Sequence, residues 1–375
     1  MHFSKKLKDI LTLGTTNLTV NLIKGLFWLF LAYLVSKTEY GELGYLMGIV
    51  TVTITVTLFG FRQTIMVYEP KKQQVFYPSL VISLISTSIG AIVIFVLFQN
   101  IFVSLLIMGL APFELIVSYY NSQKRYKDFS KFTLSRTVLM IILAIIFYKI
   151  FGLNGIFLGY FIPTLLIFKE LPTILRTQKL DFSILKSKLE FTLNAYANRI
   201  SGVLFVWGDK IIIGALFGFS LLGSYHFAAQ YFLLLEFIPR TIFQYLVPLE
   251  SEGVKNKNIK KIFIGFTCLI SIISIVFVPY GVNAILPKYQ DSIIPMQIMS
   301  LALIPMALAS IQTAQLLGKE SSRGVLFGSI LQSGSYIFFI WALGQSYGII
   351  GLSLGLLISA TIRALFFYVI KRQIS

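Results

Sequence analysis

Charged side chains inside long apolar runs are the residues of this chain with the most informative chemistry. A charge at the centre of a membrane-spanning helix costs about 2.5 to 3.5 kcal/mol, so such a residue usually faces a cavity or a charged partner. Lys24 lies deep within an apolar run. Arg199 and Lys210 are eleven residues apart, close to three helical turns, which places them on nearly the same helix face. We therefore expect Lys24, Arg199 and Lys210 to line a cationic cavity.

Acidic residues in the same runs indicate ion pairs. Asp209 is adjacent to Lys210 and points about a quarter turn or more away from it, so we expect Asp209 to line the cavity or to pair with another helix. Glu236 and Arg240 are four residues apart, a spacing that allows an ion pair on one helix face. This pair has either a gating role or a purely structural one.

Three further arginines lie near the predicted inner ends of helices, namely Arg62, Arg136 and Arg363. Long basic side chains at such positions can extend along the helix and keep their charge at the membrane surface. We expect Arg136 and Arg363 to do so, and we assign Arg62 either to this behaviour or to the gate.

The elements that must position these residues are membrane-spanning helices. Hydrophobic residues make up 56% and charged residues 13% of the 375 residues, which is too apolar for a soluble domain of this length. Crossing the hydrocarbon core takes about 20 apolar residues, and a helix satisfies its own backbone there. Hydropathy predicts about twelve spans, near residues 11–36, 42–66, 75–97, 99–121, 132–150, 152–172, 191–217, 220–247, 262–286, 293–317, 324–344 and 348–370.

The formal net charge of +17 follows the membrane topology. With the N-terminus inside, the outside loops carry only Lys37, Lys149 and Lys288, and most other basic residues fall in inside segments. This alternation obeys the positive-inside rule, so we predict that both termini are cytoplasmic. The surplus of positive charge therefore gives no reason to expect nucleic-acid binding.

Other kinds of chemistry lack the residues that they need. A single cysteine, Cys268, cannot form a disulfide framework, and the two histidines, His2 and His226, do not form a helical pair of metal ligands. The segment Gly318–Lys319 lacks the earlier glycine of a nucleotide-binding loop and is followed by Glu320. We expect no cofactor, no metal and no catalytic residues, which leaves transport as the default for this architecture.

The longest polar segment divides the chain into two halves. We predict an N-terminal six-helix lobe at 1–172, a cytoplasmic linker at 173–190 and a C-terminal six-helix lobe at 191–375. The motif Tyr40–Tyr45 has a weak echo in Leu222–Tyr225 about half the chain later. Copies with six spans each share one orientation, related by an axis along the membrane normal, and the substrate path should run between them. Chance recurrence of Gly and Tyr at helix ends is the alternative.

Several short motifs occur in an order typical of one transporter superfamily. They are Lys37-Thr38-Glu39-Tyr40-Gly41, Leu58-Phe59-Gly60-Phe61-Arg62, Asp209-Lys210 with Gly223-Ser224-Tyr225, Leu286-Pro287-Lys288-Tyr289 and Gly348-Ile349-Ile350-Gly351. With this order and spacing the chain resembles, over nearly its whole length, the O-antigen (Wzx-type) flippases of the multidrug, oligosaccharidyl-lipid and polysaccharide (MOP) exporter superfamily.

The resemblance implies an all-α, MATE-like fold of two lobes that open alternately in the bacterial inner membrane. It implies that the substrate is undecaprenyl diphosphate carrying a short oligosaccharide, such as an O-antigen repeat unit of lipopolysaccharide, delivered to the outer leaflet for the polysaccharide polymerase machinery. Lys24, Arg199 and Lys210 would then offset the desolvation of the diphosphate. The energy source is left open between the membrane potential and a coupling ion, H⁺ or Na⁺.

Three rival functions fit parts of the pattern. A drug or cation antiporter of the same superfamily should carry acidic groups in the membrane, whereas here basic groups predominate. A flippase for the peptidoglycan precursor usually has helices beyond the twelfth. A membrane polysaccharide polymerase or ligase, which is an enzyme, should present a large outside loop, and every predicted outside loop is short.

Overall fold

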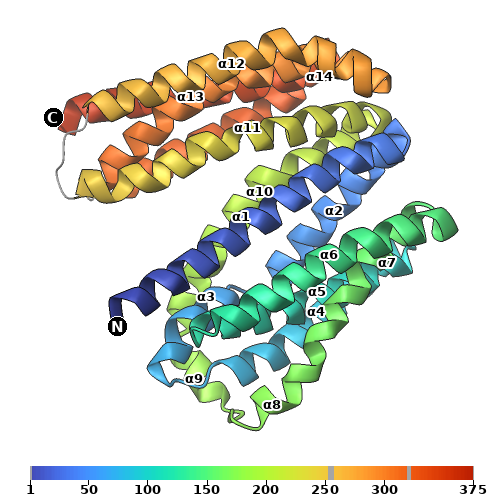
Figure 1. Cartoon of the computed structure of the whole chain (residues 1–375), viewed down its shortest axis with the longest axis vertical. Helices are drawn as coiled ribbons and strands as arrows, with labels where there is room; N and C mark the ends of the chain where they lie inside the picture. Colours follow the sequence, from blue (N-terminus) through green and yellow to red (C-terminus); the bar gives the residue numbers. More distant parts are fainter. Residues whose placement is uncertain (1, 252–256, 319–321, 375) are drawn as a thin grey trace. The chain divides into compact units, whose positions relative to one another are not determined.

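The computed structural model describes residues 2–251, 257–318 and 322–374, all within helices and short connections (Figure 1). The chain forms two compact units. Unit 1 comprises Met1–Phe27 and Tyr45–Ile211, and unit 2 comprises Trp28–Gly44 and Ile212–Ser375. Three helices contribute to both units, namely α1 (His2–Leu34), α2 (Lys37–Thr57) and α10 (Leu189–Phe217). The division into lobes at 1–172 and 191–375 stays a prediction.

Unit 1 is built around its most buried helix, α5 (Ile101–Ser122). In its most apolar stretch 72% of the residues are buried, against 28% for α4 (Phe76–Phe98). Helix α5 packs against α3, α4, α6 and α7. The remaining elements of the unit are α3 (Phe61–Tyr68), η1 (Glu69–Lys71), α6 (Tyr126–Phe151), α7 (Leu153–Phe161), η2 (Ile162–Glu170), α8 (Leu171–Leu175) and α9 (Phe182–Ser187).

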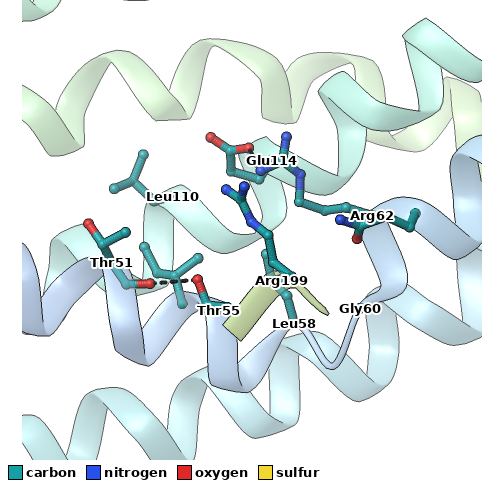
Figure 2. A pocket seen from close by; sticks show the side chains of 10 residues that line it. Thr51, Thr55, Leu58, Gly60, Arg62, Leu110, Glu114 and Arg199 are labelled. Atoms are coloured by element: carbon teal, nitrogen blue, oxygen red, sulfur yellow. Dashed lines mark hydrogen bonds and ion pairs between the residues drawn. The ribbon is translucent and has the colours of Figure 1, made fainter. Parts of the chain in front are cut away.

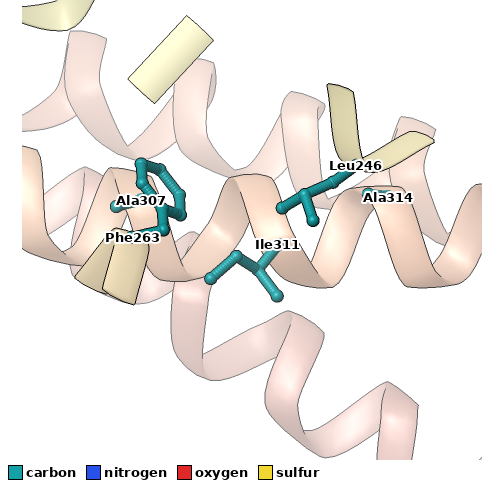
Figure 3. Close-up of a cluster of buried hydrophobic side chains, with 5 residues drawn as sticks. All are labelled: Leu246, Phe263, Ala307, Ile311 and Ala314. Carbon is teal, nitrogen blue, oxygen red and sulfur yellow. The ribbon is translucent and has the colours of Figure 1, made fainter. Parts of the chain in front are cut away.

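Unit 2 has the same plan around α13 (Ile293–Gly318), which packs against the other three long helices of the unit. These are α11 (Phe219–Ser251), α12 (Lys257–Ile285) and α14 (Ser322–Ile374), with the short η3 (Pro287–Ser292) before α13. Figure 3 shows an apolar cluster in which Leu246 of α11 and Phe263 of α12 meet Ala307, Ile311 and Ala314 of α13.

The number of helices fits the predicted membrane architecture. Within the described ranges, eight helices are long and apolar enough to cross a bilayer, and ten if each of two bent pairs counts as one span. Helix α14 contains two predicted spans joined at Gly348, whose backbone is not helical, and α11 is a further helix of 33 residues. The protein is therefore a multi-pass, all-α membrane protein, with a helix count consistent with twelve spans.

The outer face of α4 shows why the surrounding solvent must be lipid. Ile85, Ile89, Ile92 and Val96 are each about 60% exposed, and their spacing places them on one side of the helix. An exposed stripe of large aliphatic side chains is unfavourable in water but favourable against acyl chains. This face of α4 therefore contacts the hydrocarbon core.

Matched features in the two units support the predicted internal repeat. Gly152, before α7, has φ 57° and ψ −141°, and Gly348, inside α14, has φ 54° and ψ −135°. Each is followed three residues later by another glycine in a Gly-x-x-Gly-x-x-x-Gly sequence. The two central helices also correspond, because α5 contains Pro112 and α13 contains Pro305.

The Lys37–Gly41 motif has a structural role within unit 2. Ser36 and Glu39 cap the start of α2 reciprocally, since the Ser36 amide donates to Glu39 Oε2 (2.8 Å) and the Glu39 amide donates to Ser36 Oγ (3.2 Å). Lys37 Nζ lies 2.8 Å from Asp291 Oδ2, which also accepts a hydrogen bond from Ser224 Oγ (2.7 Å). The motif therefore ties the start of α2 to the segments at 224 and 291.

Candidate functional site

A break in the second predicted span creates the site. The span expected at 42–66 is not one helix, because α2 ends at Thr57 and the next helical stretch begins at Phe61 with a bend of 51°. Phe59 and Gly60 at the break have φ 45° and 79°. A Cβ on Gly60 would lie 2.5 Å from the Thr192 carbonyl oxygen, so only glycine permits this approach of the break to α10. The span predicted at 42–66 is therefore a helix broken at Phe59 and Gly60.

The break opens a cavity of about 120 Å³ within unit 1 (Figure 2). Its walls come from α2, the break itself, α3, α5 and α10. The lining residues are Thr51, Ile54, Thr55, Leu58, Gly60, Arg62, Gln63, Leu110, Glu114 and Arg199. Apolar side chains therefore alternate with hydroxyl, amide and charged groups around one small space.

An ion pair stands at the wall of the cavity. Arg62, in the first turn of α3, places Nη1 2.7 Å from Glu114 Oε2 on α5. Its Nε also donates a long hydrogen bond of 3.4 Å to Ser118 Oγ, one turn further along α5. Both charged side chains are about 30% exposed, so the pair is accessible from the cavity and not sealed within the protein.

Arg199 supplies a second guanidinium to the same cavity. Figure 2 shows its head group directed towards the Arg62 and Glu114 pair. In the part of the chain that the structure describes, Arg199 has no hydrogen bond or ion pair, although its charge interacts with those of Arg62 and Glu114. Its donors are therefore free to bind a ligand.

Two further cations interact electrostatically with the carboxylate of Glu114. Its charge interacts with those of Arg62, Arg136, Lys24 and Arg199, so the positive charges outnumber the single carboxylate. Arg136 of α6 is only 5% exposed and lies 4.8 Å from the centre of the Phe113 ring. The expectation that Arg136 reaches the membrane surface was wrong, because the side chain is directed into the packed interior of unit 1.

Asp209 and Lys210 form a separate pair. Lys210 Nζ lies 2.9 Å from Asp209 Oδ1 and donates to the Val206 carbonyl oxygen at 2.7 Å. Lys210 is 3% exposed and Asp209 is 7% exposed. Helix α10 bends by 50° between Leu204 and Val206. The prediction that Lys210 and Arg199 share a helix face assumed a straight helix, and that assumption does not hold across the bend. Asp209 therefore binds its neighbour within α10.

The ion pair expected between Glu236 and Arg240 stays a prediction. The charge of Glu236 interacts with that of Arg363 on α14, and the side chain of Arg240 lies outside the described part of the chain. Arg363 Nη1 donates to Gln332 Oε1 (2.8 Å), and its guanidinium lies 5.2 Å from the ring centre of the buried Phe367. The expectation that Arg363 extends to the membrane surface was therefore wrong.

Glu114 and Arg136 are charged residues that sequence reasoning noted inside predicted spans but did not assign to the cavity. Both stand inside predicted spans, and that position was the available signal. The sequence could not show that α3, α5, α6 and α10 turn their charged residues towards one point. Of the predicted cavity residues, the structure brings Lys24 and Arg199 to this cluster together with Arg62.

The cluster can bind an anion and can hold it reversibly. Guanidinium groups present fixed donors that match phosphate oxygens in bidentate fashion. Glu114 reduces the positive charge in the absence of a ligand, which limits the cost of keeping four cations within an apolar protein. The hydroxyl groups of Thr51 and Thr55 donate to carbonyl oxygens at 47 and 51 within α2 and leave lone pairs directed elsewhere for further contacts.

Comparisons with known proteins agree with this architecture. A sequence profile of the family described as "Polysaccharide biosynthesis protein" matches residues 30–288, while no curated protein matches the chain. The structure is similar to the lipid II flippase MurJ in an inward closed conformation, with a TM-score of 0.74 and 13% identity over 96% of this chain and 87% of that one.

Two further similarities are to MATE transporters. An inward-facing MATE family transporter of the MOP superfamily gives a TM-score of 0.67 and 16% identity over 94% of this chain and 93% of that one. The Vibrio cholerae MATE transporter VcmN gives 0.58 and 16% identity over 98% of each chain. At these identities the similarity establishes the fold, and the family match covers more than half of the sequence. This chain therefore belongs to the polysaccharide biosynthesis protein family and has the fold of the MOP superfamily transporters.

Proposed function

We propose that this protein moves a lipid-linked oligosaccharide across the bacterial inner membrane, from the cytoplasmic to the outer leaflet. The substrate is undecaprenyl diphosphate carrying a surface-polysaccharide repeat unit such as that of O-antigen. The cavity of unit 1 binds the diphosphate through Arg199 and Arg62, and Lys24 and Arg136 add positive charge around it.

The observation that carries this proposal is the charge imbalance around Glu114. Four cations interact with one carboxylate, which leaves a surplus that suits a ligand with several negative charges. Arg199 has no hydrogen-bond or ion-pair partner among the described residues. A diphosphate provides acceptor oxygens for its donors and offsets the repulsion between Arg199 and Arg62.

The size of the cavity restricts which part of the substrate it can hold. Pockets for drug-sized ligands usually measure about 300 to 1,000 Å³, whereas this one measures about 120 Å³. It suits a small charged head group and excludes an oligosaccharide. The sugar must extend out of the cavity, and the lipid chain can remain in the bilayer.

The sign of the charge separates this function from that of an antiporter with the same fold. A site for a drug cation, Na⁺ or H⁺ needs acidic groups, whereas the cluster contains four cations and a single carboxylate. Outward movement of a diphosphate is also favoured by an inside-negative potential, by about 2.3 kcal/mol per charge per 100 mV. A coupling ion is compatible with this scheme and is not required by it.

The test is the leaflet distribution of the substrate in cells that carry variants of Arg199. Arg199→Ala should cause the undecaprenyl-linked oligosaccharide to accumulate in the cytoplasmic leaflet and should reduce surface polysaccharide at least tenfold. Lys149→Ala is the matched control, because Lys149 is exposed at the end of α6 and does not line the cavity. Unchanged polysaccharide with Arg199→Ala, at normal protein level in the membrane, would contradict the proposal.

A further inference from the structure

A second basic cleft lies on unit 1, away from the residues of the proposed substrate cavity. It has a volume of about 360 Å³ and is lined by Lys72, Gln73, Gln74, Ile184, Ser187 and Lys188. The cleft is formed by the turn after α3 and by α9 with its following residue. These two segments are more than a hundred residues apart in the sequence, so we asked what holds them together.

Three hydrogen bonds fix the turn to the segment before α9, and a fourth closes the turn itself. Glu69, only 4% exposed, accepts from the Phe76 amide (2.7 Å) and from Gln178 Nε2 (3.1 Å). Gln74 Nε2 donates to the Thr177 carbonyl oxygen (3.2 Å), and Gln74 Oε1 accepts from the Lys179 amide (3.0 Å). The walls of the cleft are therefore held in place before any ligand binds, which lowers the ordering cost of binding.

The two lysines of the cleft are available for an anion. Lys188 Nζ lies 5.0 Å from the centre of the Tyr68 ring, which holds this ammonium group beside the cleft. Among the ion pairs of the described residues, none involves Lys72 or Lys188, and no carboxylate lines the cleft. The charge of the cleft is thus left without an internal anion, in contrast to the Glu114 cluster.

Apolar side chains beside the cleft indicate that its ligand is a lipid and not a soluble anion. Leu180, Phe182 and Leu189 flank α9 and are 47% to 53% exposed. A short helical segment with lysines and exposed Leu and Phe is typical of structures that lie in the membrane interface. The predicted topology places residues 173–190 on the cytoplasmic side, where anionic head groups attract basic segments.

One polar side chain of the cleft indicates the kind of head group. Gln73 lines the cleft beside Lys72, and a side-chain amide can hydrogen-bond a hydroxyl group. We propose that this cleft binds the head group of an anionic phospholipid, with Lys72 and Lys188 on its phosphate and Gln73 on a head-group hydroxyl, as phosphatidylglycerol provides. This site is independent of the substrate cavity and does not rest on the proposed function.

The test measures lipid binding to the purified full chain in nanodiscs or by native mass spectrometry, with phosphatidylglycerol titrated into phosphatidylcholine. Removing both charges in Lys72→Gln/Lys188→Gln should weaken phosphatidylglycerol binding about thirtyfold, since each lysine near an anionic surface contributes about fivefold. The charge-preserving Lys72→Arg/Lys188→Arg variant should retain most of the binding. Lys149→Gln is the matched control and should leave binding unchanged.

Three outcomes would overturn the assignment. An equal loss with Lys149→Gln would mean that only overall charge matters. Unchanged binding in the double Gln variant would exclude the cleft. Displacement of the lipid by millimolar inorganic phosphate would identify a site for a soluble anion. None of these outcomes affects the interpretation of the Arg199 experiment, because lipid binding is measured without transport.

Discussion

At the scale of single residues, two basic side chains on α10 have different surroundings. Arg199 is exposed to the cavity and has no bonded partner among the described residues, whereas Lys210 is 3% exposed and bound to Asp209 and to the Val206 carbonyl oxygen. A basic residue inside a span can therefore either bind a ligand or stabilise the packing of the protein. Burial and partners decide between these roles.

The Asp209 and Lys210 pair should matter for stability. Removing one partner of a buried ion pair costs about 3 to 5 kcal/mol because the other charge stays buried. Lys210→Ala should therefore lower the thermal unfolding temperature of the purified protein strongly, while Asp209→Asn/Lys210→Met should recover most of the loss. A Lys210→Ala protein as stable as the parent would show that the pair is not buried in this way.

Glu114 should compete with the ligand for the arginines. Glu114→Gln removes the one carboxylate among four cations and should tighten binding of a soluble probe, pyrophosphate, by about fivefold, or about 1 kcal/mol for a partly exposed charge. Asp128→Asn is the matched control, because Asp128 pairs with Arg125 in an exposed turn outside the cavity. Isothermal titration of both variants checks this, and weaker binding with Glu114→Gln would contradict the role given to Glu114.

At the scale of elements, the decisive feature is the break between α2 and α3. Hydropathy predicted the spans well, because α4, α5 and α13 begin and end within a few residues of the expected limits. It did not predict the break at Phe59 and Gly60, since both flanking stretches are apolar enough for one helix. The sequence signal for the break was Gly60. Its importance is visible only in the structure, where α10 approaches it closely.

Gly60→Ala should therefore impair the site more than an ordinary glycine substitution. The new Cβ would lie 2.5 Å from the Thr192 carbonyl oxygen in a backbone with φ 79°, so α3 and Arg62 must shift. We expect a loss of about 1 to 3 kcal/mol in stability and weaker pyrophosphate binding. Gly202→Ala, where nothing lies within 4 Å, should be neutral or slightly stabilising, as expected for Gly to Ala in a helix. Equal effects of the two substitutions would rule out the close approach.

The repeated elements carry different chemistry in the two units. Counting from Pro112 in α5 and Pro305 in α13, the position of Glu114 corresponds to that of Ala307. Ala307 lies in the apolar cluster of unit 2 (Figure 3), whereas Glu114 lies in the charged cavity of unit 1 (Figure 2). The sequence indicated the repeat, but only the packing shows that one copy keeps a charged site at this position and the other an apolar one.

At the scale of the whole molecule, composition and hydropathy were sufficient for the fold class. An all-α membrane protein follows from the length and number of apolar runs, because the bilayer admits few other structures. The charged site could be predicted only in part. Lys24 and Arg199 were recognised from their depth, whereas Arg62 was assigned to the membrane surface or to a gate. The register between helices that joins them to Glu114 and Arg136 comes from tertiary packing.

The predicted topology can be tested with single cysteines, since Cys268 is the only native one. In a Cys268→Ser background, Lys149→Cys should react with a membrane-impermeant maleimide in intact cells, and Lys188→Cys only after the membrane is opened. Both positions lie near helix ends. The reverse labelling pattern would invert the topology and place the basic segments outside.

The most direct measurement is flipping by the purified protein in liposomes that contain an undecaprenyl diphosphate-linked oligosaccharide in both leaflets. A soluble glycosidase outside the vesicles should digest essentially all of the substrate when the parent protein is present, and about half when the protein is absent or carries Arg199→Ala, while Lys149→Ala should match the parent. If the glycosidase digests only half of the substrate in liposomes that contain the folded parent protein, the proposed flipping is contradicted. Uptake of a cationic dye by the same liposomes would indicate an antiporter instead.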